Sequence, residues 1–176
     1  MELQLPHGWN EWDNSPIVLF HGTTASGAAS ILSAIDVAIG EPDKDFGRGF
    51  YTTTLRSQAS EWAERKAITS RVEQLPAIVK LTLDRVALSG LNHLGFVRKG
   101  YDAVDFWRFV FHCRQEGSHI PDQESYYDVV YGPVAEIWFD PPHRSTFPRF
   151  DQISFHTVKA QTLLNDSMLC QKELIS

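Results

Sequence analysis

Short blocks of β-favouring residues recur along the chain, each bounded by glycine, proline or charged residues, and such blocks predict strands. The clearest block is residues 17–21, an apolar run that ends at His21 and stops at Gly22, which is typical of a buried strand. The predicted strands are residues 17–21, 49–53, 77–83, 127–131 and 152–156, with 137–139 and 168–175 as further candidates.

Between these blocks, apolar residues recur with helical spacing. Ala28, Ile31, Leu32 and Ile35 share one helix face, and Thr24 or Ser26 can cap that helix. Further helices are predicted after Ser57, where the helix runs to about Ser70, within residues 101–115, and after Thr157. Strands and helices in this irregular order indicate an α+β domain, which we place at residues 17–176 behind an extended lead-in at residues 1–16.

The composition of the chain excludes several classes of function. A chain of 176 residues with a formal charge of -6 lacks the basic surface that nucleic-acid binding usually needs. Cys113 and Cys170 are the only cysteines, and the histidines do not follow metal-ligand spacing, so neither a disulfide framework nor a metal site is expected. No apolar run approaches the length that crosses a bilayer. We expect a soluble protein under cytosolic conditions, although a specialised secretion route would leave no signal here.

Two short motifs suggest a shared pocket. His21-Gly22-Thr23 follows the first strand, and residues 45–53, with the sequence DFGRGFYTT, contain the second. Alternation along that strand places Gly49 and Tyr51 on the same face. The acidic, turn-like loop that precedes it is a candidate lid. We therefore expect the two motifs to form opposite walls of one nucleotide pocket.

These motifs carry a resemblance. HGT followed by DFGRGFYTT resembles the catalytic domain of the His-Tyr-Glu ADP-ribosyltransferases, the class of the PARPs and diphtheria toxin. Trp62 follows Tyr51 at the spacing of that class's second aromatic residue, with Ser57 at the place of an intervening serine. With YDVVYGPVA and DQISFHT added, the chain is also similar to DUF3990, a bacterial family regarded as ADP-ribosyltransferase-like, some of whose members are effectors that act on host ubiquitin.

The resemblance implies split, mixed and antiparallel sheets with flanking helices, and NAD as co-substrate. It implies that the pocket residues are His21, Gly22, Thr23, Gly49, Tyr51, Ser57 and Trp62. In this scheme Tyr51 and Trp62 enclose the nicotinamide, Gly22 pairs with its carboxamide, and Ser57 adds a hydrogen bond. His21 hydrogen-bonds the adenosine-side ribose.

The third catalytic position departs from the class. Gln152 in DQISFHT stands where the class has a glutamate, so the hydrogen bond to the ribose remains available but the negative charge is missing. Asp151, Glu136 or a group on the target would have to compensate for the missing charge. Ser154 and His156 share a strand face with Gln152, and we regard them as structural.

Plainer explanations exist for each site residue. His21 can be a buried strand-end histidine, Trp62 a core residue of its helix, and Ser57 a helix cap. The resemblance favours mono-ADP-ribosylation of a protein, with ubiquitin as the acceptor that the family suggests. A silent NAD- or ADP-ribose-binding module and an NAD glycohydrolase are the alternatives. The sequence does not indicate an oligomeric state.

Overall fold

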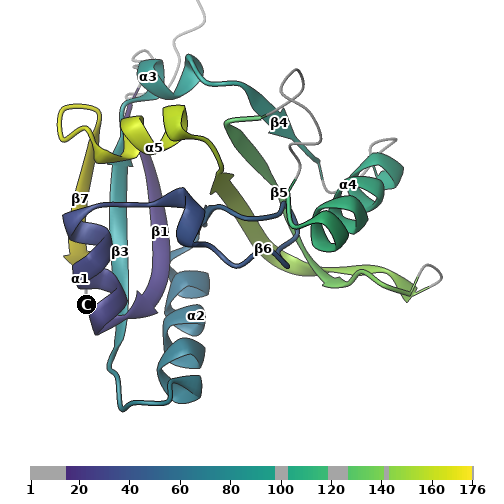
Figure 1. Ribbon diagram of the computed structural model, residues 1–176, viewed down its shortest axis with the longest axis horizontal. Coiled ribbons are helices and arrows are strands. Elements are labelled where there is room, and N and C mark those ends of the chain that lie inside the picture. Colours follow the sequence, from purple (N-terminus) through teal and green to yellow (C-terminus); the bar gives the residue numbers. More distant parts are fainter. Residues whose placement is uncertain (1–14, 98–102, 119–126, 141–142, 176) are drawn as a thin grey trace, which may run out of the picture.

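The computed structural model describes residues 15–97, 103–118, 127–140 and 143–175 (Figure 1). Most of the predicted lead-in lies outside these ranges. The strands are β1 Ile17–Thr24, β2 Phe50–Thr52, β3 Pro76–Leu83, β4 His93–Gly95, β5 Val129–Ile137, β6 Ser145–Phe155 and β7 Cys170–Ile175. The helices are α1 Ala25–Ser33, α2 Arg56–Thr69, α3 Arg85–Ser89, α4 Ala103–Glu116 and α5 Val158–Asn165, with a 3-10 turn, η1, at Val37–Ile39.

The strands form two sheets. One is antiparallel with the order β1-β3-β7, and the other has the order β2-β6-β5-β4, in which β4 runs parallel to β5. The α+β class with one antiparallel and one mixed sheet is therefore confirmed. Figure 1 shows the two sheets beside each other, with α1 and α2 against the first and α4 beside the second.

One isolated backbone bridge joins the two sheets within the described residues. Phe20 of β1 pairs with Thr53 just after β2, through backbone hydrogen bonds of 2.8 and 2.9 Å in the two directions. Beyond this bridge the two strands separate. The fold therefore leaves the far half of β1 with a free edge that faces the second sheet.

Two main apolar clusters hold the layers. Leu19, Leu81 and Phe155 belong to the larger cluster, which also includes residues of α1 and α5. An aromatic cluster centred on Phe46 packs against α4, where Phe106 meets Phe46 edge-on at 6.4 Å between ring centroids. Phe46 is fully buried, so core packing fixes the end of the loop that precedes β2.

Helix α2 packs closely on β1 because the facing side chains are small. A Cβ atom added to Gly22 would lie 1.9 Å from the carbonyl oxygen of Ala59 and 2.9 Å from the backbone nitrogen of Ala63. Both alanines are buried. The glycine of the HGT motif is therefore required by helix packing whatever else it does.

Two predicted caps are confirmed and one is wrong. Thr24 caps α1 and Thr157 caps α5 through their side-chain oxygens. The prediction that Ser57 caps α2 is wrong, because the helix begins at Arg56 and Leu55 occupies the cap without a side-chain hydrogen bond. The Leu55 backbone nitrogen instead donates to the Thr53 hydroxyl at 3.1 Å. This hydrogen bond turns the chain just before the first residue of the helix.

Strand predictions were wrong at several strand ends. β1 was expected to stop at Gly22 but continues to Thr24, and β6 begins at Ser145 and not at residue 152. Gly132-Pro133 was expected to end a strand, but β5 continues through both residues to Ile137. The register shifts directly after Pro133, and such an irregularity accommodates a residue that cannot donate to the ladder. The expected loop after residue 83 contains α3, capped by Asp84, and the short strand β4.

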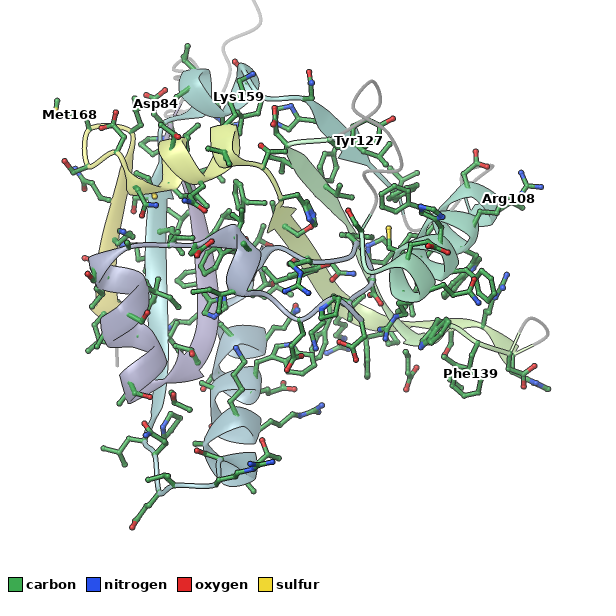
Figure 2. All side chains as sticks on the ribbon, viewed as in Figure 1. Asp84, Arg108, Tyr127, Phe139, Lys159 and Met168 are labelled. Atoms are coloured by element: carbon green, nitrogen blue, oxygen red, sulfur yellow. The ribbon has the colours of Figure 1, made fainter. Side chains whose placement is uncertain are left out.

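Figure 2 shows Arg108 pointing away from α4 and Phe139 beyond the end of β5, both outside the packed body of the molecule. Phe139 is 68% exposed.

Within the described ranges, no helix is both long enough and apolar enough to cross a membrane.

Gly22→Ala should lower the free energy of unfolding by about 3 kcal/mol, the upper end of the usual cost of overpacking, because the new methyl group meets backbone atoms. Urea unfolding followed by circular dichroism measures this change. Gly90→Ala is the matched control, since its Cβ would meet only the Ala87 oxygen at 3.4 Å. Equal stability of the two variants would contradict the packing of α2 on β1.

Candidate functional site

A cavity of about 560 Å³ opens where the two sheets separate. Its lining comes from β1, α1, the loop at 36–45, β2, α2, the facing parts of β5 and β6, and Arg114 of α4. It brings together most of the residues that the sequence predicted, namely His21, Gly22, Gly49, Tyr51, Trp62 and Gln152. The loop predicted as a lid also contributes, with Asp36, Glu41, Asp43, Lys44 and Asp45 in the lining.

Two predicted residues do not line the cavity. Thr23 is buried, and its hydroxyl lies 2.3 Å from where a Cβ of Gly27 would be, so its side chain packs under α1. Ser57 is exposed in the first turn of α2. The geometry gives neither side chain a place in this pocket.

His21 is held in one tautomer. Its Nδ1 lies 2.5 Å from the Tyr51 carbonyl oxygen, which can only accept, so Nδ1 carries the proton. The ring also stacks on Phe50 at 4.7 Å between centroids. Burial and the Lys66 ammonium lower the pKa of His21 to about 3, against the opposing effect of the Tyr51 carbonyl. At neutral pH the ring is uncharged, and Nε2 is left as a hydrogen-bond acceptor.

Among the described residues, the backbone groups that Gly22 directs to the cavity have no hydrogen-bond partner. Phe20 directs both its backbone groups towards Thr53, and residues two apart in a strand point to the same edge. Gly22 therefore directs its N–H and C=O to the edge that β2 has already left. Ile78 lies opposite Gly22 in β3, but this pairing falls between the ladder hydrogen bonds. Gly22 thus offers one donor and one acceptor side by side.

The Tyr51 hydroxyl is used in hydrogen bonds within the protein, whereas Tyr51 also lines the cavity. The hydroxyl accepts from the Phe46 backbone nitrogen at 3.0 Å and donates to the Gly47 carbonyl at 2.7 Å. Gly47 has a φ of 78°, a left-handed conformation that glycine adopts without strain. Burial raises the pKa of Tyr51 well above its usual value, so the hydroxyl stays protonated. Its hydrogen bonds fix the ring at the cavity.

Gly49 belongs to the site for a packing reason. A Cβ there would lie 2.6 Å from both the His156 Nδ1 and the Phe155 carbonyl oxygen. His156 is itself fixed, since its Nδ1 donates to the Arg48 carbonyl at 2.8 Å and its Nε2 lies 2.7 Å from the Ser154 hydroxyl. Ser154 and His156 are buried, in agreement with the structural role expected for them.

Helix α2 contributes an aromatic and a cationic side chain. Trp62 is 37% exposed, which argues against a purely core role, and the Arg65 guanidinium lies 5.4 Å from its ring centroid. Lys66, one turn further along, lines the same cavity and makes no ion pair within the described residues. Partial burial and the Lys44 ammonium lower the pKa of Lys66.

Gln152 lies in a polar cluster that sequence reasoning missed. Its Nε2 donates to the Asp45 carboxylate at 2.6 Å and to the Pro133 carbonyl at 2.9 Å. Asp45 is 4% exposed and pairs with Arg114 of α4 at 2.6 Å. Asp45 is part of the DFGRGFYTT motif, and its position before the buried Phe46 was the available signal, whereas nothing in the sequence marked Arg114.

The two carboxylates expected to compensate for Gln152 lie elsewhere. Asp151 accepts hydrogen bonds from the backbone nitrogen and hydroxyl of Thr54 and from the Thr53 hydroxyl, so it fastens β6 to the end of β2. Glu136 is exposed and accepts from Ser145 at 3.1 Å. Neither lines the cavity, and the carboxylate beside Gln152 is Asp45. Across the described ranges, no three His, Cys, Asp or Glu side chains cluster as a metal site.

Comparison with known proteins gives one match. The family described as "Protein of unknown function (DUF3990)" matches residues 17–138, which include His21, Asp45, Tyr51, Trp62 and Arg114 but end before Gln152. No curated protein and no solved structure matches the chain.

His21 should remain neutral, with the proton on Nδ1, at every pH above about 4, since its pKa is lowered to about 3. Long-range ¹H–¹⁵N NMR of the imidazole, assigned with His21→Gln, measures both properties. Below pH 6.5 the unfolded chain binds a proton that folded His21 does not, so stability falls as the pH drops from 6.5 towards 3. Titration near pH 6.5 would show that the ring is neither buried nor close to Lys66.

Proposed function

We propose that this chain, which belongs to the DUF3990 family, is an NAD-dependent mono-ADP-ribosyltransferase that modifies a protein and releases nicotinamide. One observation carries the proposal. The neutral His21 and the unpaired backbone of Gly22 lie on one strand edge of a cavity that Tyr51, Trp62 and Gln152 also line.

The nicotinamide end is supported by Gly22 and the aromatic residues. A carboxamide has a donor and an acceptor side by side, which complements the N–H and C=O of Gly22. Tyr51 and Trp62 offer ring faces to a flat cationic ring, and such contacts contribute about 1 kcal/mol each at partly buried sites. A carboxylate in place of the carboxamide would face the Gly22 carbonyl and be rejected.

The remainder of NAD meets complementary groups. The Nε2 of His21 accepts a hydrogen bond from a ribose hydroxyl and needs no proton transfer to do so. Lys66 lies in the lining next to His21, where its ammonium would attract the diphosphate. These contacts orient NAD, and orientation alone can lower a barrier by several kcal/mol.

In the reaction, the bond between the anomeric carbon and the nicotinamide nitrogen breaks, and its electron pair leaves with nicotinamide. The ribose passes through an oxocarbenium-like state. A nucleophile of the acceptor protein then forms a bond to the anomeric carbon and loses its proton. Polymer elongation is not expected, because Gln152 brings no charge of its own to this step. The family resemblance suggests ubiquitin as acceptor.

A silent NAD- or ADP-ribose-binding module is the second candidate. One observation favours it, namely that the nearest carboxylate, Asp45, is already paired with Arg114. Charge stabilisation of the transition state is then weak. Calorimetry separates the two functions, since a module binds intact NAD tightly without turnover.

Incubation with labelled NAD and bacterial or eukaryotic lysates should release nicotinamide and add the mass of ADP-ribose to a protein. Both signals should fall by at least about tenfold in His21→Ala and Trp62→Ala, because each removes contacts that orient NAD. Tyr51→Ala should lose them as well, with its folding checked by circular dichroism.

His143→Ala is the control variant, since the His143 side chain is 72% exposed and, within the described ranges, pairs with Asp140 alone. It should match the wild type. A purified protein that neither releases nicotinamide nor modifies any lysate protein would contradict the transferase, and failure to bind NAD would exclude the binding module too.

A further inference from the structure

The Asp45 carboxylate is a buried acceptor for three different parts of the chain. Its Oδ1 accepts from the Arg114 Nε at 3.0 Å and Nη2 at 2.6 Å. Its Oδ2 accepts from the Ala135 backbone nitrogen at 2.8 Å and from the Gln152 Nε2 at 2.6 Å. In each of these four hydrogen bonds, the carboxylate of Asp45 is the acceptor. A donor placed at residue 45 would therefore conflict with its surroundings.

These contacts fix the orientation of the Gln152 amide. Both partners of its Nε2, the Asp45 carboxylate and the Pro133 carbonyl, can only accept hydrogen bonds, so the amide cannot be reversed. Its Oε1 has no hydrogen-bond partner within the described part of the chain. The one fully buried side-chain nitrogen or oxygen there without a partner is His112 Nε2, so the Gln152 Oε1 is not fully buried. Gln152 lines both the cavity and a smaller pocket beside Tyr131 and Phe150, and its partner Asp45 lies on the cavity side.

We propose that Asp45 is a positioning residue that, with Arg114, holds the Gln152 carbonyl towards the cavity as the acceptor for a ribose hydroxyl of NAD. This inference rests on the proposed function and deepens it. In this arrangement, Gln152 has a role of its own that an ionised glutamate could not fill. It is the side chain that the buried Asp45 requires, because it gives Asp45 a donor and gives the ribose an acceptor.

A glutamate at position 152 tests this directly. It would bring a second carboxylate to within hydrogen-bond distance of Asp45, and two carboxylates so close in a buried site hold a shared proton rather than both ionising. While the proton is shared, the new side chain imitates glutamine. Once the proton is lost at higher pH, the carboxylates repel each other and the carbonyl leaves its position.

The experiment compares the wild type, Gln152→Glu, Asp45→Asn and the double variant Asp45→Asn with Gln152→Glu, each assayed for nicotinamide release across pH 5.5 to 8.5. Gln152→Glu should lose at least about tenfold in kcat between low and high pH relative to the wild type, with a smaller change in KM. Asp45→Asn should lose kcat at every pH, because its amide meets the donor groups of Gln152 and Ala135.

The double variant restores a donor–acceptor pair between the side chains of residues 45 and 152 in the reverse sense, but its amide still meets the Ala135 N–H. It should recover part of the activity that Gln152→Glu loses at high pH. Asp105→Asn is the control, since Asp105 is 72% exposed on α4 beside Arg108, which points into solvent (Figure 2). It should behave as the wild type.

Unfolding measured without NAD gives a second test that does not depend on turnover. The raised pKa of the shared proton makes Gln152→Glu progressively less stable than the wild type as pH rises above about 4, and the double variant should not show this trend.

The outcomes separate the two proposals. A wild type that does not release nicotinamide overturns the proposed function and, with it, the ribose role given to Gln152. Two results overturn this inference alone, provided that the wild type turns over NAD. One is an Asp45→Asn variant with unchanged kcat, and the other is a Gln152→Glu variant as active as the wild type at pH 8.5. If the stability of Gln152→Glu depends on pH as that of the wild type does, residue 152 does not interact with Asp45 as proposed. This conclusion holds whether or not the wild type turns over NAD.

Discussion

The structure depends on one edge of β1, which is hydrogen-bonded to the second sheet at Phe20 and no longer bonded to it at Gly22. The Phe20–Thr53 bridge joins the two sheets, and beyond it β1 and β2 separate to make room for the cavity. The unpaired backbone of Gly22 would be costly in a dry core. At a cavity these groups are accessible, and α2 can approach Gly22 closely because this residue has no side chain. Gly22 thus satisfies a packing constraint and, in the proposed function, a binding constraint as well.

The second sheet is organised around a buried charge. Asp45 links the loop before β2 to α4 through Arg114, to β5 through Ala135 and to β6 through Gln152. Removing one partner of a buried ion pair leaves an uncompensated charge, so these elements depend on one another. The Tyr51 hydroxyl secures the same loop from the β2 side. Structural polar groups therefore set the positions of the rings and amides that face the cavity.

Sequence patterns predicted the local features well. The strand that begins at Ile17 and the cap at Thr157 follow from periodicity and capping chemistry, and the family resemblance suggested that Tyr51 and Trp62 line one cavity. The strand through Gly132-Pro133 was missed because the register irregularity that accommodates the proline depends on β6, far away in the sequence. Arg114 was missed for the same reason, since its ion pair with Asp45 forms only when α4 packs on the loop. Ser57 looked like a helix cap, but the turn made by Thr53 decides where α2 begins.

The central claim is that the free edge of β1 recognises a carboxamide in NAD. The most direct measurement is the ¹H–¹⁵N NMR signal of the Gly22 amide during titration with NAD, nicotinamide and nicotinic acid. We predict a downfield shift of the Gly22 amide proton with NAD and nicotinamide, and none with nicotinic acid, whose carboxylate the Gly22 carbonyl repels. Binding of NAD that leaves the Gly22 amide unchanged, or an equal response to nicotinic acid, would contradict this account.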